Sequence, residues 1–272
     1  MQTLSELIPL PSAAGQIAVH RHGDPRAPAV YMAHSILSSS AMWTTQAALL
    51  ASRGWQVLCA DTRGHGDSVA RQPPATMQQL VDDTIAVLDA LGLQKVHYVG
   101  LSLGGMSGFG LALAHADRLA SLCLCAARAD MPPEAAAPWD ERIATAEREG
   151  CAALAQPTLE RWFGRAFLDA HPDTAQRLLQ VAASTSVTGF VGCARAIQGL
   201  DYLARVHEIA LPTTLIVGAN DGVLPQAMAD IQRRMAGSVL EVIAQAGHLP
   251  NIDQPAAFDA ALLRHLGTPE RR

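Results

Sequence analysis

Short apolar or β-branched runs alternate along the chain with segments whose apolar residues recur at helical spacing. This alternation is typical of α/β proteins, in which helices cover both faces of a mostly parallel sheet. Apolar spacing predicts one helix over Met77–Leu91, which Gly92 ends, and another over Pro255–Leu266, which a proline begins. Six runs are predicted to be strands: Ala29–Ala33, Gln56–Ala60, Val96–Leu101, Leu119–Cys125, Thr213–Val217 and Val239–Ile243.

The alternation stops between Asp130 and about Arg205, where helical patterns follow one another without a strand. We interpret this segment as a helical cap inserted into the sheet domain. The predicted organisation is therefore a first core part over 1–129, a cap over 130–205 and a second core part over 206–272. Trp139 and Trp162 fall in the cap, where they would suit a lid over a pocket or the packing of the cap on itself.

Composition narrows the class of protein. The 272 residues are 49% hydrophobic and 17% charged, which is enough apolar material for a large core. A net charge of -5 without any Lys/Arg-rich run argues against a nucleic-acid partner. No apolar stretch approaches the roughly 18 residues of a membrane span, so no membrane association is expected. The first residues carry no basic region followed by an apolar core, which predicts a cytoplasmic protein.

The five cysteines give no evidence of disulfides or of a metal site. They are odd in number and lie mostly in apolar contexts, so we expect reduced core residues. Cys123 and Cys125 alternate with leucines on a predicted strand, but no histidine or further cysteine accompanies them.

The sequence Gly-Leu-Ser-Leu-Gly over 100–104 follows a predicted buried strand and precedes a helix rich in small residues. This is the context of a nucleophile elbow, in which a serine sits on a sharp strand-to-helix turn. Glycines two positions before and after the serine let the neighbouring backbone pass closely. We therefore predict Ser102 as a nucleophile; the alternative is that Ser102 only caps the helix.

A serine hydroxyl needs a base that takes its proton, and the base needs a carboxylate that orients it. Asp221 follows the strand over Thr213–Val217, and His248 follows the last strand. Both come after Ser102 in the order Ser, Asp, His, and both fall in loops at the rim where strands end. A turn-forming aspartate and a solvated loop histidine are the alternatives, with Asp201 or Asp230 as the substitute acid.

The tetrahedral intermediate of acyl transfer needs two backbone N–H donors. Leu103, the residue after the nucleophile, is predicted to supply one. The loop after the strand Ala29–Ala33 is predicted to supply the other from Ile36, with Ser35 as its neighbour or rival. The Ser35 hydroxyl is also a candidate substrate contact, unless it serves only the geometry of the turn.

Taken together, these residues resemble an α/β-hydrolase, and in detail the 3-oxoadipate enol-lactonases of aromatic catabolism. The chain departs from that family at His34–Leu37, where an Asn-Ser-Leu-Gly type of loop is expected. The resemblance runs along nearly the whole chain and rests on six segments: Ser40–Trp43, Asp61–Gly66, Gly100–Met106, Trp139–Ile143, Glu160–Phe167 and Ala246–Asn251.

The resemblance implies hydrolysis of a five-membered enol-lactone that bears a carboxymethyl group. Ser102, His248 and Asp221 would form the triad, and neither a metal nor an organic cofactor would be required. The segment Asp61–Ser68 resembles a structural turn common in this superfamily, pinned by Arg63 and His65. A metal site from His65 and Asp67 lacks a companion ligand at suitable spacing.

An anionic substrate also needs a counter-charge, and arginine suits a carboxylate. The predicted substrate contacts are Arg128, Trp139 and Trp162, together with Ser35; for the tryptophans, core packing is the alternative. Four arginines lie in or near the cap: Arg128, Arg142, Arg161 and Arg165.

The expected partner is thus a small lactone or ester, and the oligomeric state stays open. Other hydrolytic functions for the same triad are a general carboxylesterase, a cofactor-free perhydrolase and a carbon-carbon bond hydrolase. A different class of function is a ligand receptor on the same fold, which would bind without turnover.

Overall fold

The computed structural model describes residues 4–269, so the first three residues considered above for the N-terminus lie outside the described residues. Within 4–269, nine strands form one sheet of order β1-β2-β4-β3-β6-β7-β8-β9, and β5 also pairs with β2. The strands are β1 Leu4–Pro9, β2 Gly15–His22, β3 Ala29–Ala33, β4 Gln56–Ala60, β5 Val69–Ala70, β6 Val96–Leu101, β7 Leu119–Cys125, β8 Thr213–Gly218 and β9 Val239–Ile243.

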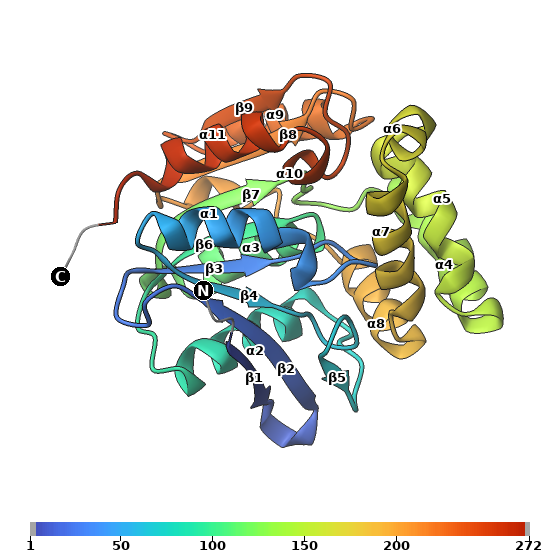
Figure 1. Cartoon of the computed structure of the whole chain (residues 1–272), viewed down its shortest axis with the longest axis horizontal. Helices are drawn as coiled ribbons and strands as arrows, with labels where there is room; N and C mark the ends of the chain where they lie inside the picture. The colour runs from blue at the N-terminus through green and yellow to red at the C-terminus, as the bar shows by residue number, and fades with distance from the viewer. Residues whose placement is uncertain (1–3, 270–272) are drawn as a thin grey trace.

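Helices flank this sheet, with α1 and α11 on the face nearer the viewer and α2 and α3 on the other (Figure 1). The α-helices are α1 Thr44–Ser52, α2 Met77–Ala90, α3 Leu103–Ala114, α4 Pro133–Glu149, α5 Ala152–Phe163, α6 Arg165–Ala170, α7 Pro172–Ser184, α8 Val187–Gln198, α9 Leu224–Arg234, α10 Pro250–Asp253 and α11 Pro255–Leu266. The predicted α/β class, with a mostly parallel sheet covered on both faces, is confirmed.

All six predicted strands are present, and only β8 is longer, by one residue. The strands that the pattern did not predict are β1, β2 and β5, which pair antiparallel at one side of the sheet. Most of β1 is exposed, and β2 has polar or half-exposed residues among its buried positions. The continuous apolar runs that mark the central parallel strands are therefore missing here.

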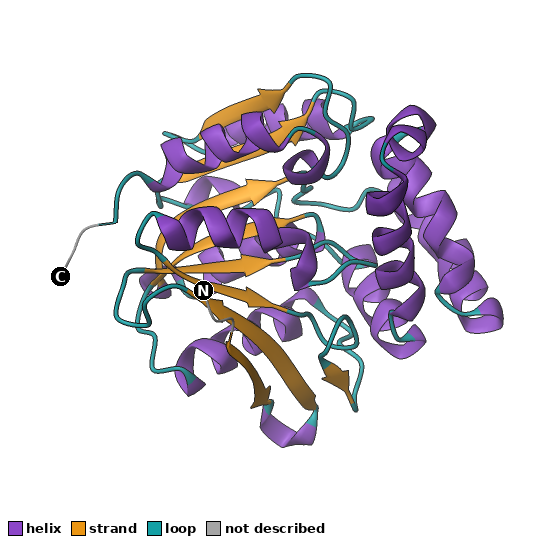
Figure 2. Ribbon diagram, viewed as in Figure 1, coloured by secondary structure: helices purple, strands orange, loops and turns teal. Residues whose placement is uncertain are grey.

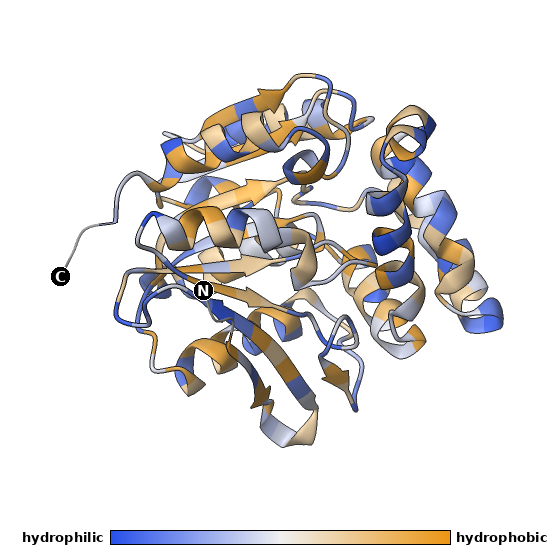
Figure 3. Ribbon diagram, viewed as in Figure 1, coloured by the Kyte–Doolittle hydropathy of each residue, from blue (hydrophilic) through white to orange (hydrophobic). Residues whose placement is uncertain are grey.

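The described stretch between β7 and β8 contains five α-helices, α4 to α8, and no strand. They lie together beyond the carboxyl ends of the central strands, whose arrows point toward them (Figures 1 and 2). The strands are coloured mainly as hydrophobic, whereas the helices of this group mix hydrophobic and hydrophilic residues (Figure 3). We call α4–α8 the cap; its predicted division from the core at residues 130 and 205 stays a prediction.

The cap leaves and rejoins the core through two adjacent segments, 129–131 and 200–202, which we call the cap stalk. The Tyr202 N–H donates to the Ala129 carbonyl at 2.7 Å, and the Met131 N–H donates to the Leu200 carbonyl at 3.0 Å. These bonds join the two ends of the insertion to each other. Among the described residues, no helix is both long and apolar enough to cross a membrane.

Candidate active site

Ser102 stands at the turn between β6 and α3 in a strained conformation. Its φ of 54° lies in the left-handed region, which residues with side chains seldom adopt. The strain is held by backbone bonds on both sides, from the Ser102 N–H to the Cys125 carbonyl and from the Met106 N–H to the Ser102 carbonyl, each 2.8 Å. A Cβ on Gly104 would lie 2.5 Å from the Ala33 carbonyl oxygen, so this position requires glycine.

The three residues predicted as a triad are joined by hydrogen bonds. His248 Nε2 lies 3.0 Å from Ser102 Oγ, and His248 Nδ1 lies 2.8 Å from Asp221 Oδ2. The serine and the histidine are 5% and 6% exposed, so these contacts lie largely out of bulk water. The arrangement lets one imidazole take a proton from the hydroxyl while the carboxylate stabilises the imidazolium.

The loops that carry the acid and the base are tied to each other. The Asn220 N–H donates to the Ala246 carbonyl at 2.8 Å, which joins the residue before Asp221 to the segment that leads to His248. The substitute acids lie elsewhere, because Asp201 is paired in the cap stalk and Asp230 bonds to Arg233 on α9.

Trp162 of the cap packs directly against the histidine. Its ring stacks on His248 with centroids 6.0 Å apart and planes 25° from parallel, and its carbonyl accepts the His248 N–H at 2.8 Å. Trp162 is buried. The cap therefore helps to orient the base, a role that the sequence did not indicate; its role as a substrate contact stays a prediction.

Asp253 on α10 also supports the histidine loop, a role that no sequence pattern indicated. Its Oδ2 accepts the Gly247 N–H at 2.6 Å, which fixes the residue just before His248. Burial raises the pKa of Asp253 to about 6, and the backbone N–H donors around the carboxylate oppose this shift. An aspartate that ends a short helix gives no sign in sequence that its carboxylate supports the loop before that helix.

The Leu103 and Ile36 amides, predicted as oxyanion donors, belong to two segments that are hydrogen-bonded to each other. The Gly104 N–H donates to the His34 carbonyl at 3.1 Å, which brings the loop after β3 against the start of α3. Within residues 4–269, neither the Leu103 nor the Ile36 N–H donates to another group. Ser35 is fully buried, and its hydroxyl lies 3.4 Å from the Ile36 carbonyl.

His34, the residue that departs from the family pattern, is a buried structural group. Its Nε2 accepts the Thr62 N–H at 2.8 Å, so its Nδ1 carries the proton and donates to the Ser35 carbonyl at 2.7 Å. Burial lowers the pKa of His34, which keeps the ring neutral. His34 therefore links the loop after β3 to the loop after β4.

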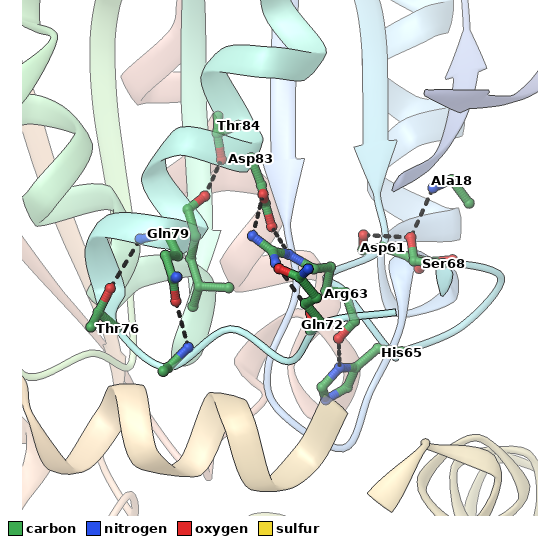
Figure 4. A network of polar contacts seen from close by, with 12 residues as sticks. Ala18, Asp61, Arg63, His65, Ser68, Gln72, Thr76, Gln79, Asp83 and Thr84 are labelled. Atoms are coloured by element: carbon green, nitrogen blue, oxygen red, sulfur yellow. Dashed lines mark hydrogen bonds and ion pairs between the residues drawn. The ribbon is translucent and has the colours of Figure 1, made fainter. Parts of the chain in front are cut away.

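The Asp61–Ser68 loop has the contacts of a structural turn (Figure 4). Two Arg63 donors, Nε and one Nη, lie 2.6 Å from the Asp83 carboxylate on α2, and the other Nη donates to the Gln72 carbonyl at 3.2 Å. Both charged side chains are buried. His65 Nδ1 lies 3.2 Å from the Arg63 carbonyl, and burial lowers the pKa of His65 to about 3. These contacts agree with the interpretation that Arg63 and His65 pin the turn.

The four candidate arginines separate into two pairs. Arg128 and Arg165 each face a carboxylate, at 3.5 Å from Asp130 and 3.4 Å from Glu160. Neither Arg142 nor Arg161 forms an ion pair with any carboxylate in the described part of the chain. The use of Arg128 as a substrate contact stays a prediction, but its guanidinium already has a partner.

The unpaired arginines lie on neighbouring helices, α4 and α5. Burial lowers the pKa of Arg142, and the positive charge of Arg161 lowers it further. Desolvation by the surrounding protein lowers the pKa of Arg161, and the negative charge of Asp221 partly offsets this shift. Trp139 carries the Arg142 guanidinium 4.2 Å above its ring, and it packs against Phe190. Arg142 is thus near Arg161, and Arg161 is near Asp221 of the acid–base pair.

Comparison with known proteins agrees with this fold. The family model described as alpha/beta hydrolase fold matches residues 28–255. The chain therefore belongs to the α/β-hydrolase family.

Two kinds of relative are similar over nearly the full chain. The 3-oxoadipate enol-lactonase 1 of Acinetobacter baylyi is 32% identical over 89% of this chain and 90% of its own length. The crystal structure of the enol-lactonase from Burkholderia xenovorans LB400 has a TM-score of 0.90 at 29% identity, covering 96% of this chain and 99% of that one. A thermophilic esterase from Thermogutta terrifontis has a TM-score of 0.88 at 28% identity, covering 98% of both chains. The protein is a hydrolase related to enol-lactonases and esterases.

Proposed function

We propose that the protein hydrolyses a small lactone or ester that bears a carboxylate, with Ser102 as nucleophile, His248 as base and Asp221 as orienting acid. The observation that carries this proposal is the continuous hydrogen-bonded path from Ser102 Oγ through the imidazole to Asp221. A five-membered enol-lactone is the substrate that we favour, because the enol-lactonase relatives span the whole fold, including the cap.

The reaction follows from the position of each group. His248 Nε2 takes the hydroxyl proton as Ser102 Oγ bonds to the lactone carbonyl carbon, and the oxyanion accepts from the Leu103 and Ile36 N–H groups. The intermediate collapses by breaking the bond to the ring oxygen, which leaves as an enol with the proton from His248 and then tautomerises to a ketone. Water, deprotonated by His248, attacks the acyl carbon, and the Ser102 oxygen leaves with that proton.

Arg142 and Arg161 are the groups that we propose for the substrate carboxylate. A charge-assisted, two-pronged bond would supply the carboxylate partner that both guanidinium groups lack; among the described residues, Arg142 otherwise donates only to the Thr158 hydroxyl, at 3.4 Å, and lies over the Trp139 ring. The mutual repulsion of the two cations would be relieved when an anion lies between them. This assignment replaces Arg128 as the favoured recognition residue.

The test compares a carboxylated enol-lactone with an uncharged aryl ester of similar size. We expect the wild-type kcat/KM to be higher for the lactone, and Ser102→Ala to abolish both reactions. If the aryl ester is turned over well and the lactone is not, the protein is a general carboxylesterase, as the esterase relative suggests. Tight ligand binding without turnover of either compound would favour a receptor.

A further inference from the structure

A histidine and two aspartates meet away from the proposed active site. His20 lies on β2, Asp61 follows β4, and Asp67 lies later in the same loop. Because β2 runs antiparallel beside β4, His20 comes next to the end of that strand. Its Nε2 lies 3.5 Å from Asp61 Oδ2 and 3.7 Å from Asp67 Oδ2. His65 is the histidine close to Asp67 in sequence, whereas His20 is the one whose ring faces Asp67 in the structure.

The distances from His20 to the two carboxylates are ion-pair distances that are longer than ordinary hydrogen bonds. An N–H···O bond spans about 2.7–3.2 Å. Ligand atoms about 2.1 Å from a tetrahedral metal ion lie about 3.4 Å from each other. One ligand atom from each of the three residues lies within 4.8 Å of the other two. Small side-chain shifts therefore suffice to place all three around one ion.

Two of the three side chains are already fixed in position. Asp61 is buried, and its carboxylate accepts the Ser40 N–H at 2.6 Å and the Asp67 N–H at 2.9 Å. His20 Nδ1 lies 2.9 Å from Ser5 Oγ, which leaves Nε2 directed at the carboxylates. Such outer bonds orient the ligands of metal sites. Asp67 is 77% exposed at its side chain and is free to close on an ion.

The cluster opens into a cavity of about 460 Å³. His20, Asp61 and Asp67 all line it, and Val181 and Ser184 of α7 line its cap side. The cavity leaves room for water or a small anion as a fourth ligand, which three protein ligands require in a tetrahedral site.

We propose that His20, Asp61 and Asp67 bind one divalent transition-metal ion, with Zn²⁺ as the ion that fits best. One imidazole and two carboxylates are a mixed nitrogen and oxygen set, which suits zinc and its neighbours; Mg²⁺ and Ca²⁺ prefer oxygen alone. The ion would join β2 to the loop after β4 and stabilise the folded chain. Ser102 and His248 take no part in this site.

Equilibrium dialysis of the tag-free protein against Zn²⁺, together with thermal denaturation, tests the proposal. We expect one saturable equivalent in the wild type, and a rise in Tm of roughly 5 °C at a hundredfold excess of Zn²⁺ over Kd. Asp67→Asn and His20→Gln should each weaken binding about 100-fold or more, and Ser5→Ala about tenfold. The matched control Asp169→Asn, an exposed aspartate of the cap, should bind as the wild type does.

Two results would overturn the site. One is the absence of saturable Zn²⁺ binding to the wild type; the other is an unchanged equivalent in both Asp67→Asn and His20→Gln. Displacement of Zn²⁺ by equimolar Mg²⁺ or Ca²⁺ would contradict the assigned class of ion. Because Asp67 is exposed, Asp67→Asn should fold even if His20→Gln does not. Ser102→Ala should retain the Zn²⁺ equivalent, which separates this proposal from the hydrolytic one.

Discussion

The core and the cap hold their functional side chains in opposite ways. In the core, Ser102, His248 and Asp221 are joined to one another, and backbone bonds fix the loops around them. In the cap, Arg142 and Arg161 have no carboxylate partner among the described residues. The difference indicates that the core is organised before substrate arrives, whereas the cap keeps uncompensated charge that a substrate can satisfy. Under the proposed function, the core would carry out the reaction and the cap arginines would select the substrate.

The largest expected effect tests the core. Ser102→Ala should lower kcat by about 10⁶-fold on any ester or lactone, because the acyl intermediate cannot form. Steady-state kinetics measure the loss, and Ser52→Ala, an exposed serine on α1, is the matched control. A variant that retained a tenth of wild-type activity would remove Ser102 from the mechanism.

Asp221→Asn should lower kcat by about 10⁴-fold, because the amide no longer stabilises the imidazolium or holds its tautomer. Asp230→Asn, on the surface of α9, should change kcat little. The pH–rate profile of both variants provides the measurement. A similar small loss in both would mean that another carboxylate orients His248.

In the cap, Arg142→Met should act on recognition alone. Loss of a charged hydrogen bond of about 1.5–3 kcal/mol predicts a roughly 10- to 150-fold fall in kcat/KM for a carboxylated substrate. The uncharged aryl ester should be turned over almost as before. Arg165→Met, which removes an arginine already paired with Glu160, is the control. An equal loss on both substrates would show that Arg142 supports the fold rather than the carboxylate.

The smallest expected effect concerns Asp253 beneath the histidine loop. Its folded pKa of about 6 lies above the ordinary aspartate value, so the folded state holds this proton more tightly than the unfolded state does. Stability from this group is therefore present at low pH and declines as pH rises from about 4 to 6.

Asp253→Asn removes this titration and keeps an oxygen that can accept the Gly247 N–H. Relative to the wild type, the variant should gain Tm by about a few degrees between pH 4 and pH 7.5. Thermal denaturation across that range measures the difference, with Asp169→Asn as the control. A constant difference in Tm at every pH would contradict the prediction.

The sequence predicted the central architecture well because buried parallel strands have a strong local pattern. The six predicted strands, the turn at Ser102 and the order of Asp221 and His248 all follow from residues close in sequence. Strand β2 lacks that pattern, because its polar residues, His20 to His22 among them, are only half-buried.

Side-chain partners in the cap were beyond sequence reasoning. Four arginines look alike in the chain, and only the folded structure shows that Asp130 and Glu160 neutralise two of them. The stacking of Trp162 on His248 is equally invisible, because it joins residues 86 positions apart through the packing of α5 on the core.

The cap stalk bears on how the cap can be exchanged between related proteins. The two ends of the cap meet at one hydrogen-bonded junction. Different helices could therefore be joined to the core there without altering the pairing of any strand. A replaced cap would leave the sheet unchanged but would have to supply again the contact that Trp162 makes with His248.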